Sequence, residues 1–179
     1  MLRIDCAPTS GYPGITLRQL ERADIDAWYA YLKLPQVFEH TSWNLSSPAD
    51  LNAQFEGYAS TSPESIRRMA VVDESAGALI GTIGFHSISD VNRTAEIAYD
   101  LCPSHWGRGI AHAICTSVTA WAFVQYGFLR VQATVLTSNA RSARVLVACG
   151  YQYEGLLRSY RMVRGTPGDF VLYSRLATD

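Results

Sequence analysis

Residues 94–122 join a predicted strand to a predicted helix through a loop with two glycines, and this segment constrains the fold most strongly. From Thr94 to Leu101 apolar and polar side chains alternate, which predicts a strand that ends before Pro103. From Ile110 onward apolar residues recur at helical spacing and predict a helix with one buried face. The glycine loop leads into the first turn of that helix. A strand, loop and helix in this order are typical of an anion-binding site at the helix N-terminus, but equally of a glycine-eased turn that binds nothing.

The rest of the chain adds strands and helices in an order typical of one α+β domain. Strands are predicted at 15–18, 69–73, 79–86, 130–136, 151–158 and 170–176, and helices at 24–32, 47–58 and 139–150. Residues 1–14 contain two prolines and two glycines and are expected to be a flexible lead-in. Because no linker or repeat follows, a single domain with a mixed sheet is expected over 15–179.

Composition excludes several other classes of protein. Apolar residues make up 48% and charged residues 17% of the chain, as in ordinary globular domains. The net charge of −1 argues against a nucleic-acid-binding protein, because such domains are usually strongly basic. The cysteines and histidines are too scattered for a zinc site, so no metal is expected. Without a signal sequence or a membrane-spanning apolar stretch, the protein is expected to be cytoplasmic and to have no membrane partner.

The charges are distributed unevenly along the chain. Residues 104–165 contain seven arginines and a single acid, Glu154, whereas the remainder has an excess of acids. A polyanionic ligand is therefore expected near the glycine loop, and a cationic one near the acidic part. Arg67 and Arg68 are expected to be a solvated pair, and His86 to lie at the surface.

The residues around the glycine loop exclude three familiar motifs. A dinucleotide fingerprint would need glycine where His112 stands, and a Walker loop needs Gly-Lys-Ser/Thr, although Lys33 is the only lysine. The nucleophile-elbow sequence G-x-S-x-G occurs nowhere. Two interpretations stay open on this ground: an anion-binding loop, or a glycine turn that binds nothing.

Residues 106–111 resemble the phosphate loop R/Q-x-x-G-x-G/A of the GNAT superfamily of N-acetyltransferases, with Trp106 where Arg or Gln is usual. Residues 139–151 resemble the Asn-capped helix of that superfamily and the Gly-aromatic pair that follows it. Further matches lie at 154–158 and 171–176. The resemblance covers about residues 15–176 and is greatest to the RimJ/RimL-like branch, which acetylates ribosomal-protein N-termini and related amines.

The resemblance implies a fold and a co-substrate. The fold is a mixed, mostly antiparallel sheet that splays open between two central parallel strands, with helices on both faces. The co-substrate is acetyl-coenzyme A, with its pyrophosphate on the loop amides and its pantetheine arm along the strand at 99–101. The residues implied to contact it are Tyr99, Leu101, Trp106, Gly107, Arg108, Gly109, Ile110, Ala111, Asn139 and Ser142.

Acetyl transfer to an amine requires a base for the amine and stabilisation of the departing thiolate. Glu96, beside the expected splay, is the leading candidate base, and its alternative role is that of a solvated strand residue. Glu39 and His40 are further candidate bases in the loop expected to border the acceptor site. Trp43 is expected to form a wall of that site.

The group that assists the thiolate stays open between two residues. Many members of the superfamily carry a tyrosine seven residues after the capping Asn, where this chain has Leu146. Ser142 is the substitute that the RimJ/RimL-like branch suggests, and it would donate a hydrogen bond to the sulfur. Tyr160 is a further candidate donor, with a packed hairpin aromatic as its alternative role.

The predicted function is acetyl-coenzyme A dependent N-acetylation of a primary amine, on a protein N-terminus or a small molecule, by direct attack in a ternary complex. The alternative is a non-catalytic coenzyme A-binding or regulatory module of the same fold, which Leu146 favours. The sequence leaves the identity of the amine open. A monomer or homodimer is expected from the resemblance.

Overall fold

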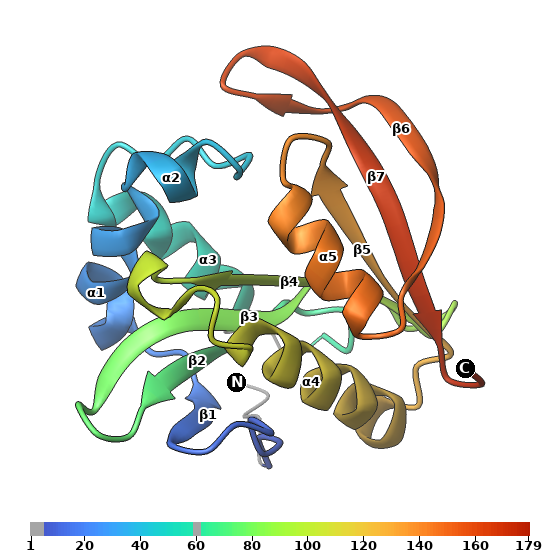
Figure 1. The fold of residues 1–179 in the computed structure, drawn as a ribbon, viewed down its shortest axis with the longest axis horizontal. Helices are drawn as coiled ribbons and strands as arrows, with labels where there is room; N and C mark the ends of the chain where they lie inside the picture. The colour runs from blue at the N-terminus through green and yellow to red at the C-terminus, as the bar shows by residue number, and fades with distance from the viewer. Residues whose placement is uncertain (1–5, 59–61) are drawn as a thin grey trace.

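The computed structural model describes residues 6–58 and 62–179, and this part of the chain forms a seven-stranded sheet with helices on both faces (Figure 1). The strand order is β1-β2-β3-β4-β5-β7-β6, and only the β4–β5 pair is parallel. The expected α+β class with a mixed, mostly antiparallel sheet is confirmed. The strands are β1 (Ile15–Gln19), β2 (Arg67–Asp73), β3 (Ala78–Ser89), β4 (Thr94–Leu101), β5 (Arg130–Leu136), β6 (Gln152–Val163) and β7 (Thr166–Leu176). The helices are α1 (Ile25–Leu32), α2 (Pro35–Phe38), α3 (Asn52–Tyr58), α4 (Ile110–Tyr126) and α5 (Ala140–Ala148), with 3-10 turns at Arg22–Asp24, Pro48–Leu51 and Pro103–His105.

Strand β2 separates two hydrophobic cores. Met69 and Val71 pack in the core that contains the buried residues of α4 and α5, whereas Ala70 and Val72 pack in the core of α1 and α3. Successive side chains of a strand point to opposite faces, so a strand that is apolar throughout needs cover on both. Helices α1 to α3 lie on one side of the sheet, and α4 and α5 on the other (Figure 1).

Strands β4 and β5 pair over only a short length. Their parallel register runs from Thr94–Arg130 to Glu96–Gln132. Beyond Glu96, β4 stays paired with β3 and β5 stays paired with β7, but β4 and β5 separate. The expected splay is therefore present. Within the described residues, the β5-facing edge of 97–101 has no strand partner.

The residues just before β1 lie against α4 rather than apart from the domain. The Ser117 hydroxyl donates to the carbonyl of Thr9, and the buried Ser10 hydroxyl donates to the carbonyl of Ile15 at 2.6 Å. The expectation of a flexible lead-in also covers residues 1–5, which lie outside the described residues.

The closing hairpin is longer than predicted. Strand β6 continues to Val163 and β7 begins at Thr166, so the turn is at residues 164–165, and Pro167 and Gly168 lie inside β7. Most side chains of β6 are exposed, so its sequence lacks the apolar alternation by which strands are predicted. The extended hairpin brings Arg161 to β4 and the turn residue Arg164 to α2.

Candidate functional site

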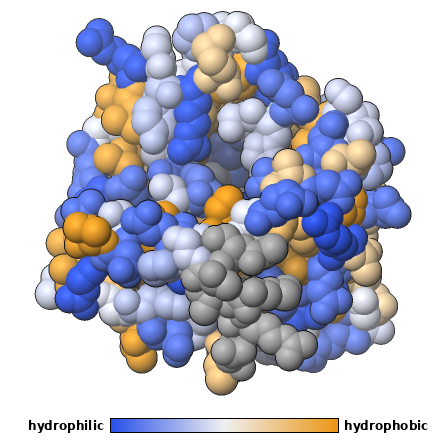
Figure 2. All heavy atoms as spheres, turned by 180° about the vertical axis from the view of Figure 1, so that it is seen from behind, coloured by the Kyte–Doolittle hydropathy of each residue, from blue (hydrophilic) through white to orange (hydrophobic). Residues whose placement is uncertain are grey.

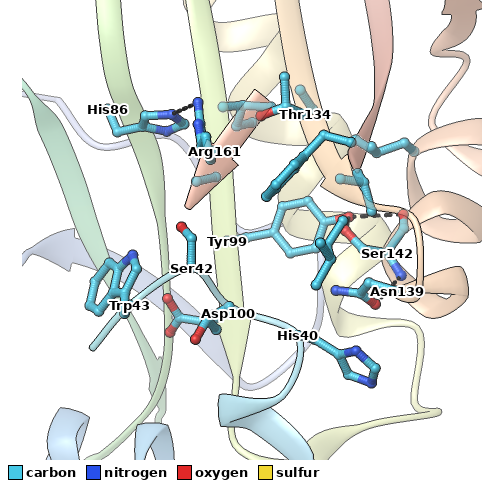
Figure 3. Close-up of a pocket in the computed structure, with 18 of the residues that line it drawn as sticks. His40, Ser42, Trp43, His86, Tyr99, Asp100, Thr134, Asn139, Ser142 and Arg161 are labelled. Carbon is cyan, nitrogen blue, oxygen red and sulfur yellow. Dashed lines mark hydrogen bonds between the residues drawn. The ribbon is translucent and has the colours of Figure 1, made fainter. Parts of the chain in front are cut away.

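The splay opens into a cavity of about 440 Å³ between the two halves of the sheet. Strand β4 lines it with residues 97–100, and β5 lines it with residues 133–136. The loop after α2, the start of α5 and the closing hairpin complete the walls (Figure 3). Seen from behind, the molecular surface is hollowed between mainly hydrophilic side chains (Figure 2). The cavity thus combines a free strand edge with polar groups from distant parts of the chain.

The glycine loop leads from η3, the 3-10 turn at Pro103–His105, to the first turn of α4. Gly107 and Gly109 have φ of 75° and 83°, a left-handed conformation that favours glycine, and open space lies where a Cβ would stand on either. Within the described chain, the amides of residues 107–112 donate to no backbone carbonyl. Free amides at the positive end of a helix form a site suited to a phosphate group. The loop therefore fits the pyrophosphate expected there, with the exposed Arg108 beside it.

Trp106 fastens this loop to the end of β4. Its indole nitrogen donates to the carbonyl of Leu101 at 2.8 Å, and the guanidinium carbon of Arg141 lies 4.2 Å from its ring centroid. The side chain that replaces the usual Arg or Gln therefore has a structural anchor of its own. It also brings the positive charge of Arg141, on α5, toward the loop.

The start of α5 places two polar side chains at the cavity, those of Asn139 and Ser142. The Asn139 side chain accepts a hydrogen bond from the Ser142 amide at 3.1 Å, which confirms Asn139 as the helix N-cap. The Ser142 hydroxyl lies 2.9 Å from the hydroxyl of Tyr99 on β4 (Figure 3). The sequence predicts only main-chain contacts for Tyr99, so this pairing was missed. Leu146, where a tyrosine was sought, is fully buried and also lines the cavity.

Glu96 lies at the centre of a polar cluster. It is only 4% exposed, so the alternative of a solvated strand residue is wrong. Its carboxylate accepts hydrogen bonds from the Thr134 hydroxyl and, at 3.0 Å, from Arg161, and His86 Nε2 lies 3.2 Å away. The Gln132 side-chain nitrogen donates to the other Glu96 carboxylate oxygen at 3.4 Å and completes the cluster.

His86 lines the cavity, whereas the sequence predicted that it would lie at the surface. The reason is a β-bulge: in the β3–β4 register Phe85 pairs with Ile97 and Ser87 with Glu96, so His86 is the extra residue. A bulge turns its side chain away from regular alternation. Arg161, the other cation at Glu96, was not predicted because it comes from the underestimated hairpin.

The surroundings of Glu96 keep its carboxyl ionised. Burial by itself would raise the pKa of Glu96. Hydrogen bonds from His86 and Thr134 and the charges of His86 and Arg161 outweigh that effect and lower the pKa to about 2. A general base works best when its pKa lies near the operating pH. Glu96 is therefore poorly suited to accepting a proton at neutral pH, and it is not among the residues that line the cavity.

The same pKa shift predicts a pH-dependent contribution to stability. At pH 7, Glu96→Gln should lower the free energy of unfolding by up to about 3 kcal/mol, because the pKa falls from 4.5 to about 2 on folding. This stabilisation is fully present above pH 4.5, the pKa of Glu96 in the unfolded chain, and is lost as the pH falls toward about 2, its pKa in the folded protein. Urea denaturation at pH 7 and at about pH 3 should show a smaller difference between variant and wild type at the lower pH.

Glu154 provides the matched control for that experiment. Hydrogen bonds from Arg130 and Ser174 lower the pKa of Glu154 to about 2 as well, but this carboxylate is solvent-exposed. Glu154→Gln should therefore cost less than about 1 kcal/mol. Equal losses of unfolding free energy in the two variants would contradict the proposed stabilisation by the Glu96 carboxylate. So would a loss in Glu96→Gln that does not vary with pH.

The loop after α2 forms the opposite wall, as expected. His40 and Trp43 line the cavity, and Trp43 packs edge-on against Trp28 at 5.4 Å between ring centroids. The Glu39 side chain is 59% exposed, pairs with His40 at 3.2 Å and is not among the residues that line the cavity. Arg164 donates to the carbonyls of residues 38, 39 and 41, so the hairpin turn is tied to this loop.

Arg68 lies in the cavity wall, so the prediction that it is exposed to solvent is wrong. It is 5% exposed, donates to Thr82 at 2.7 Å and forms an ion pair with Asp100, which also accepts from Tyr31. Its neighbour Arg67 points to the other face of the sheet, where it lies over the ring of Tyr126. Strand alternation therefore separates the two arginines.

Tyr160, the other candidate for the thiolate, is placed differently from Ser142. Its side chain is not among the residues that line the cavity, and it is 42% exposed. Its ring packs against Phe170 at 5.8 Å and against the Arg161 guanidinium. This geometry matches the packed hairpin aromatic.

The part of the chain that the structure describes offers neither a metal-binding cluster nor a membrane-spanning helix. Among the described residues, no group of three or more His, Cys, Asp or Glu side chains is arranged to hold a metal ion. None of the helices in this part of the chain has the length and apolar character needed to cross a membrane.

Comparison with known proteins agrees with the geometry. Residues 15–152 match the acetyltransferase (GNAT) domain family. The uncharacterized N-acetyltransferase YoaA of Bacillus subtilis is 33% identical, covering 89% of this chain and 92% of the relative. The ribosomal-protein-serine acetyltransferase of Escherichia coli is 35% identical over 55% of each chain. The fold is similar to that of a spermidine N-acetyltransferase from Vibrio cholerae in complex with CoA and spermine, with a TM-score of 0.81, 21% identity, and coverage of 93% of this chain and 98% of that one.

Proposed function

Because the chain belongs to the GNAT acetyltransferase family, we propose that it transfers an acetyl group from acetyl-coenzyme A to a primary amine by direct attack in a ternary complex. The observation that carries this proposal is the splay between β4 and β5. It leaves a free strand edge at 97–101 that leads from the polar cavity toward the glycine loop.

Acetyl-coenzyme A would occupy the half of the cleft formed by β4, α4 and α5. The free amides from Gly107 to Ala111 would hold the pyrophosphate, and the β4 edge would pair with the amides of the pantetheine arm. Asn139, which lines the cavity, would bind a pantetheine amide. When bound, this co-substrate supplies the activated acetyl thioester.

The amine would enter the half formed by the α2 loop and the closing hairpin. Glu96, held as a carboxylate, would position Arg161 and His86, which line the cavity. The neutral form of the amine, in protonation equilibrium with bulk solvent, would attack the thioester carbon, and the proton that its nitrogen then loses would pass to the departing thiolate or to solvent rather than to Glu96. Ser142 donates a hydrogen bond to the thiolate as it leaves.

An acceptor panel tests the proposal. Spermidine and spermine represent small amines, as in the Vibrio cholerae neighbour, and a peptide with an N-terminal serine represents the Escherichia coli relative. With acetyl-coenzyme A present, we expect thiol release with at least one of them, measured with a colorimetric thiol reagent. If coenzyme A binds but no acceptor in the panel causes thiol release from acetyl-coenzyme A, the non-catalytic alternative would be supported instead.

Removal of the Ser142 hydroxyl should slow turnover without loss of the co-substrate. Ser142→Ala is expected to lower kcat about 10- to 100-fold, as for loss of one charge-stabilising hydrogen bond. The affinity for acetyl-coenzyme A should change little, because the Asn139 side chain accepts its hydrogen bond from the Ser142 main-chain amide, which the variant keeps. Steady-state kinetics and calorimetry measure the two effects separately.

Ser138→Ala is the matched control for this variant. Ser138 is an exposed hydroxyl one residue before the helix cap and does not line the cavity. Its loss should leave kcat unchanged. If Ser142→Ala also turned over at the wild-type rate, Ser142 would have no role at the thiolate.

A further inference from the structure

The hydroxyl groups of Tyr99 and Ser142 form a pair that joins the middle of the sheet to the start of α5 (Figure 3). The Tyr99 oxygen lies 2.9 Å from Ser142 Oγ and 3.2 Å from the Ser142 carbonyl oxygen. Only one of the two hydroxyls can donate within the Oγ contact. Which one donates decides where the remaining hydrogen of Ser142 points.

The surroundings make Tyr99 the donor. The carbonyl oxygen of Ser142 can only accept, so the Tyr99 hydrogen points toward Ser142, where a three-centre hydrogen bond shares it between that carbonyl at 3.2 Å and the nearer Oγ at 2.9 Å. The Tyr99 ring packs against the core beneath α4 and α5. Burial, together with the neighbouring Cys115 thiol, raises the pKa of Tyr99 well above 10, so the phenol keeps its proton. Ser142 Oγ then accepts from Tyr99, and its own hydrogen is free to turn into the cavity.

We propose that Tyr99 is a positioning residue, which donates to Ser142 Oγ and thereby aims the Ser142 O–H at the sulfur of coenzyme A. This inference rests on the proposed function, in which Ser142 stabilises the departing thiolate. In this role the Tyr99 hydroxyl contacts Ser142 rather than a reactant and keeps its proton throughout. Its contribution is orientation, because an unguided serine hydroxyl rotates freely among its partners.

Tyr99→Phe tests the role while keeping the ring that packs in the core. We expect kcat to fall about tenfold, while KM for acetyl-coenzyme A stays within about threefold of wild type. In the Ser142→Ala background, Tyr99→Phe should lower kcat no further, because the two residues act through one hydrogen bond. The acceptor is whichever of spermidine, spermine and the serine peptide is acetylated fastest.

A second readout needs no acceptor. Bound coenzyme A is titrated with pH, and its thiolate is followed by ultraviolet absorbance. A hydrogen bond from Ser142 favours the thiolate. The pH midpoint of ionisation should therefore rise by about one unit in both Tyr99→Phe and Ser142→Ala, since a tenfold loss equals one unit.

Tyr151→Phe is the matched control. Tyr151 is a buried phenol in the same core, and its hydroxyl pairs with Thr119 at 2.7 Å, away from the cavity lining. This variant should lose thermal stability but keep kcat and the thiol midpoint. A loss of kcat equal to that of Tyr99→Phe would assign both effects to packing and overturn the positioning role.

The outcomes separate this inference from the function on which it rests. If Ser142→Ala shifts the thiol midpoint and Tyr99→Phe does not, Ser142 keeps its role and the role of Tyr99 is overturned. If neither variant shifts it, both roles are wrong. If no acceptor is acetylated but both variants shift the midpoint, the positioning inference holds for a protein that binds coenzyme A without catalysis.

Discussion

Gly109→Asp is expected to abolish binding of acetyl-coenzyme A while the domain stays folded. The substitution places a carboxylate among the free amides at the start of α4, where it repels the pyrophosphate and competes for the same donors. An acid at a helix N-terminus is itself favourable, and open space surrounds the position. The left-handed φ of 83° costs about 1 kcal/mol for a residue with a Cβ. We expect the dissociation constant, measured by calorimetry, to rise at least about a hundredfold, as for loss of several charge-assisted hydrogen bonds.

Two variants control for strain and bulk. Gly77→Asp introduces the same side chain at a φ of 60° in the β2–β3 turn, also in open space, and should leave binding unchanged. Gly109→Asn has nearly the shape of Gly109→Asp without the charge and tolerates the left-handed conformation. It should weaken binding much less. If coenzyme A bound to Gly109→Asp with wild-type affinity, the glycine loop would not be the pyrophosphate site.

Arg68→Met is expected to cause the largest loss of stability. The variant keeps most of the apolar stem of the side chain but leaves the carboxylate of Asp100, whose side chain is only 11% exposed, without its cation. Removing one partner of a buried ion pair typically costs about 3–5 kcal/mol. For a domain of this size, such a loss should lower Tm by roughly 10 °C, measured by calorimetry or circular dichroism.

Arg67→Met is the control for that prediction. Arg67 is adjacent in sequence, but its guanidinium lies over Tyr126 and donates to the carbonyl of Pro63 near the surface. Its loss should cost about 1 kcal/mol or less. In addition, Asp100→Asn should recover part of the stability of Arg68→Met, because the buried charge is then removed. Equal losses from the two arginine variants would contradict the buried pair.

The features that could be predicted from the sequence depend on residues close together in the chain. The glycine loop needs only the free amides of one helix start and two residues that adopt positive φ, all within 107–112. The Asn139 cap likewise depends on an amide three residues later. The functional roles of both stay predictions, but their conformations follow from local physical chemistry.

The polar cluster at Glu96 could not be predicted in this way, because its members are distant in sequence. Thr134 is 38 residues from Glu96 and Arg161 is 65 residues away, and each reaches it only through strand pairing. His86 joins them because of one β-bulge, which alternation in the sequence does not reveal. The low pKa of Glu96, which makes it a poor candidate for the base, follows from these contacts.

The sequence by itself therefore determined the class of fold, the order of the strands and of the helices other than the short α2, and the loop that suits a phosphate. Each of these follows from hydrophobic periodicity or from backbone preferences within a few residues. Only the tertiary structure decided which charges are buried, which are paired, and which hydroxyl faces Ser142. These properties depend on strand register and on the bulge between β3 and β4. A shift of one residue along a strand moves a side chain from one face of the sheet to the other, and so decides whether it meets water or the cavity.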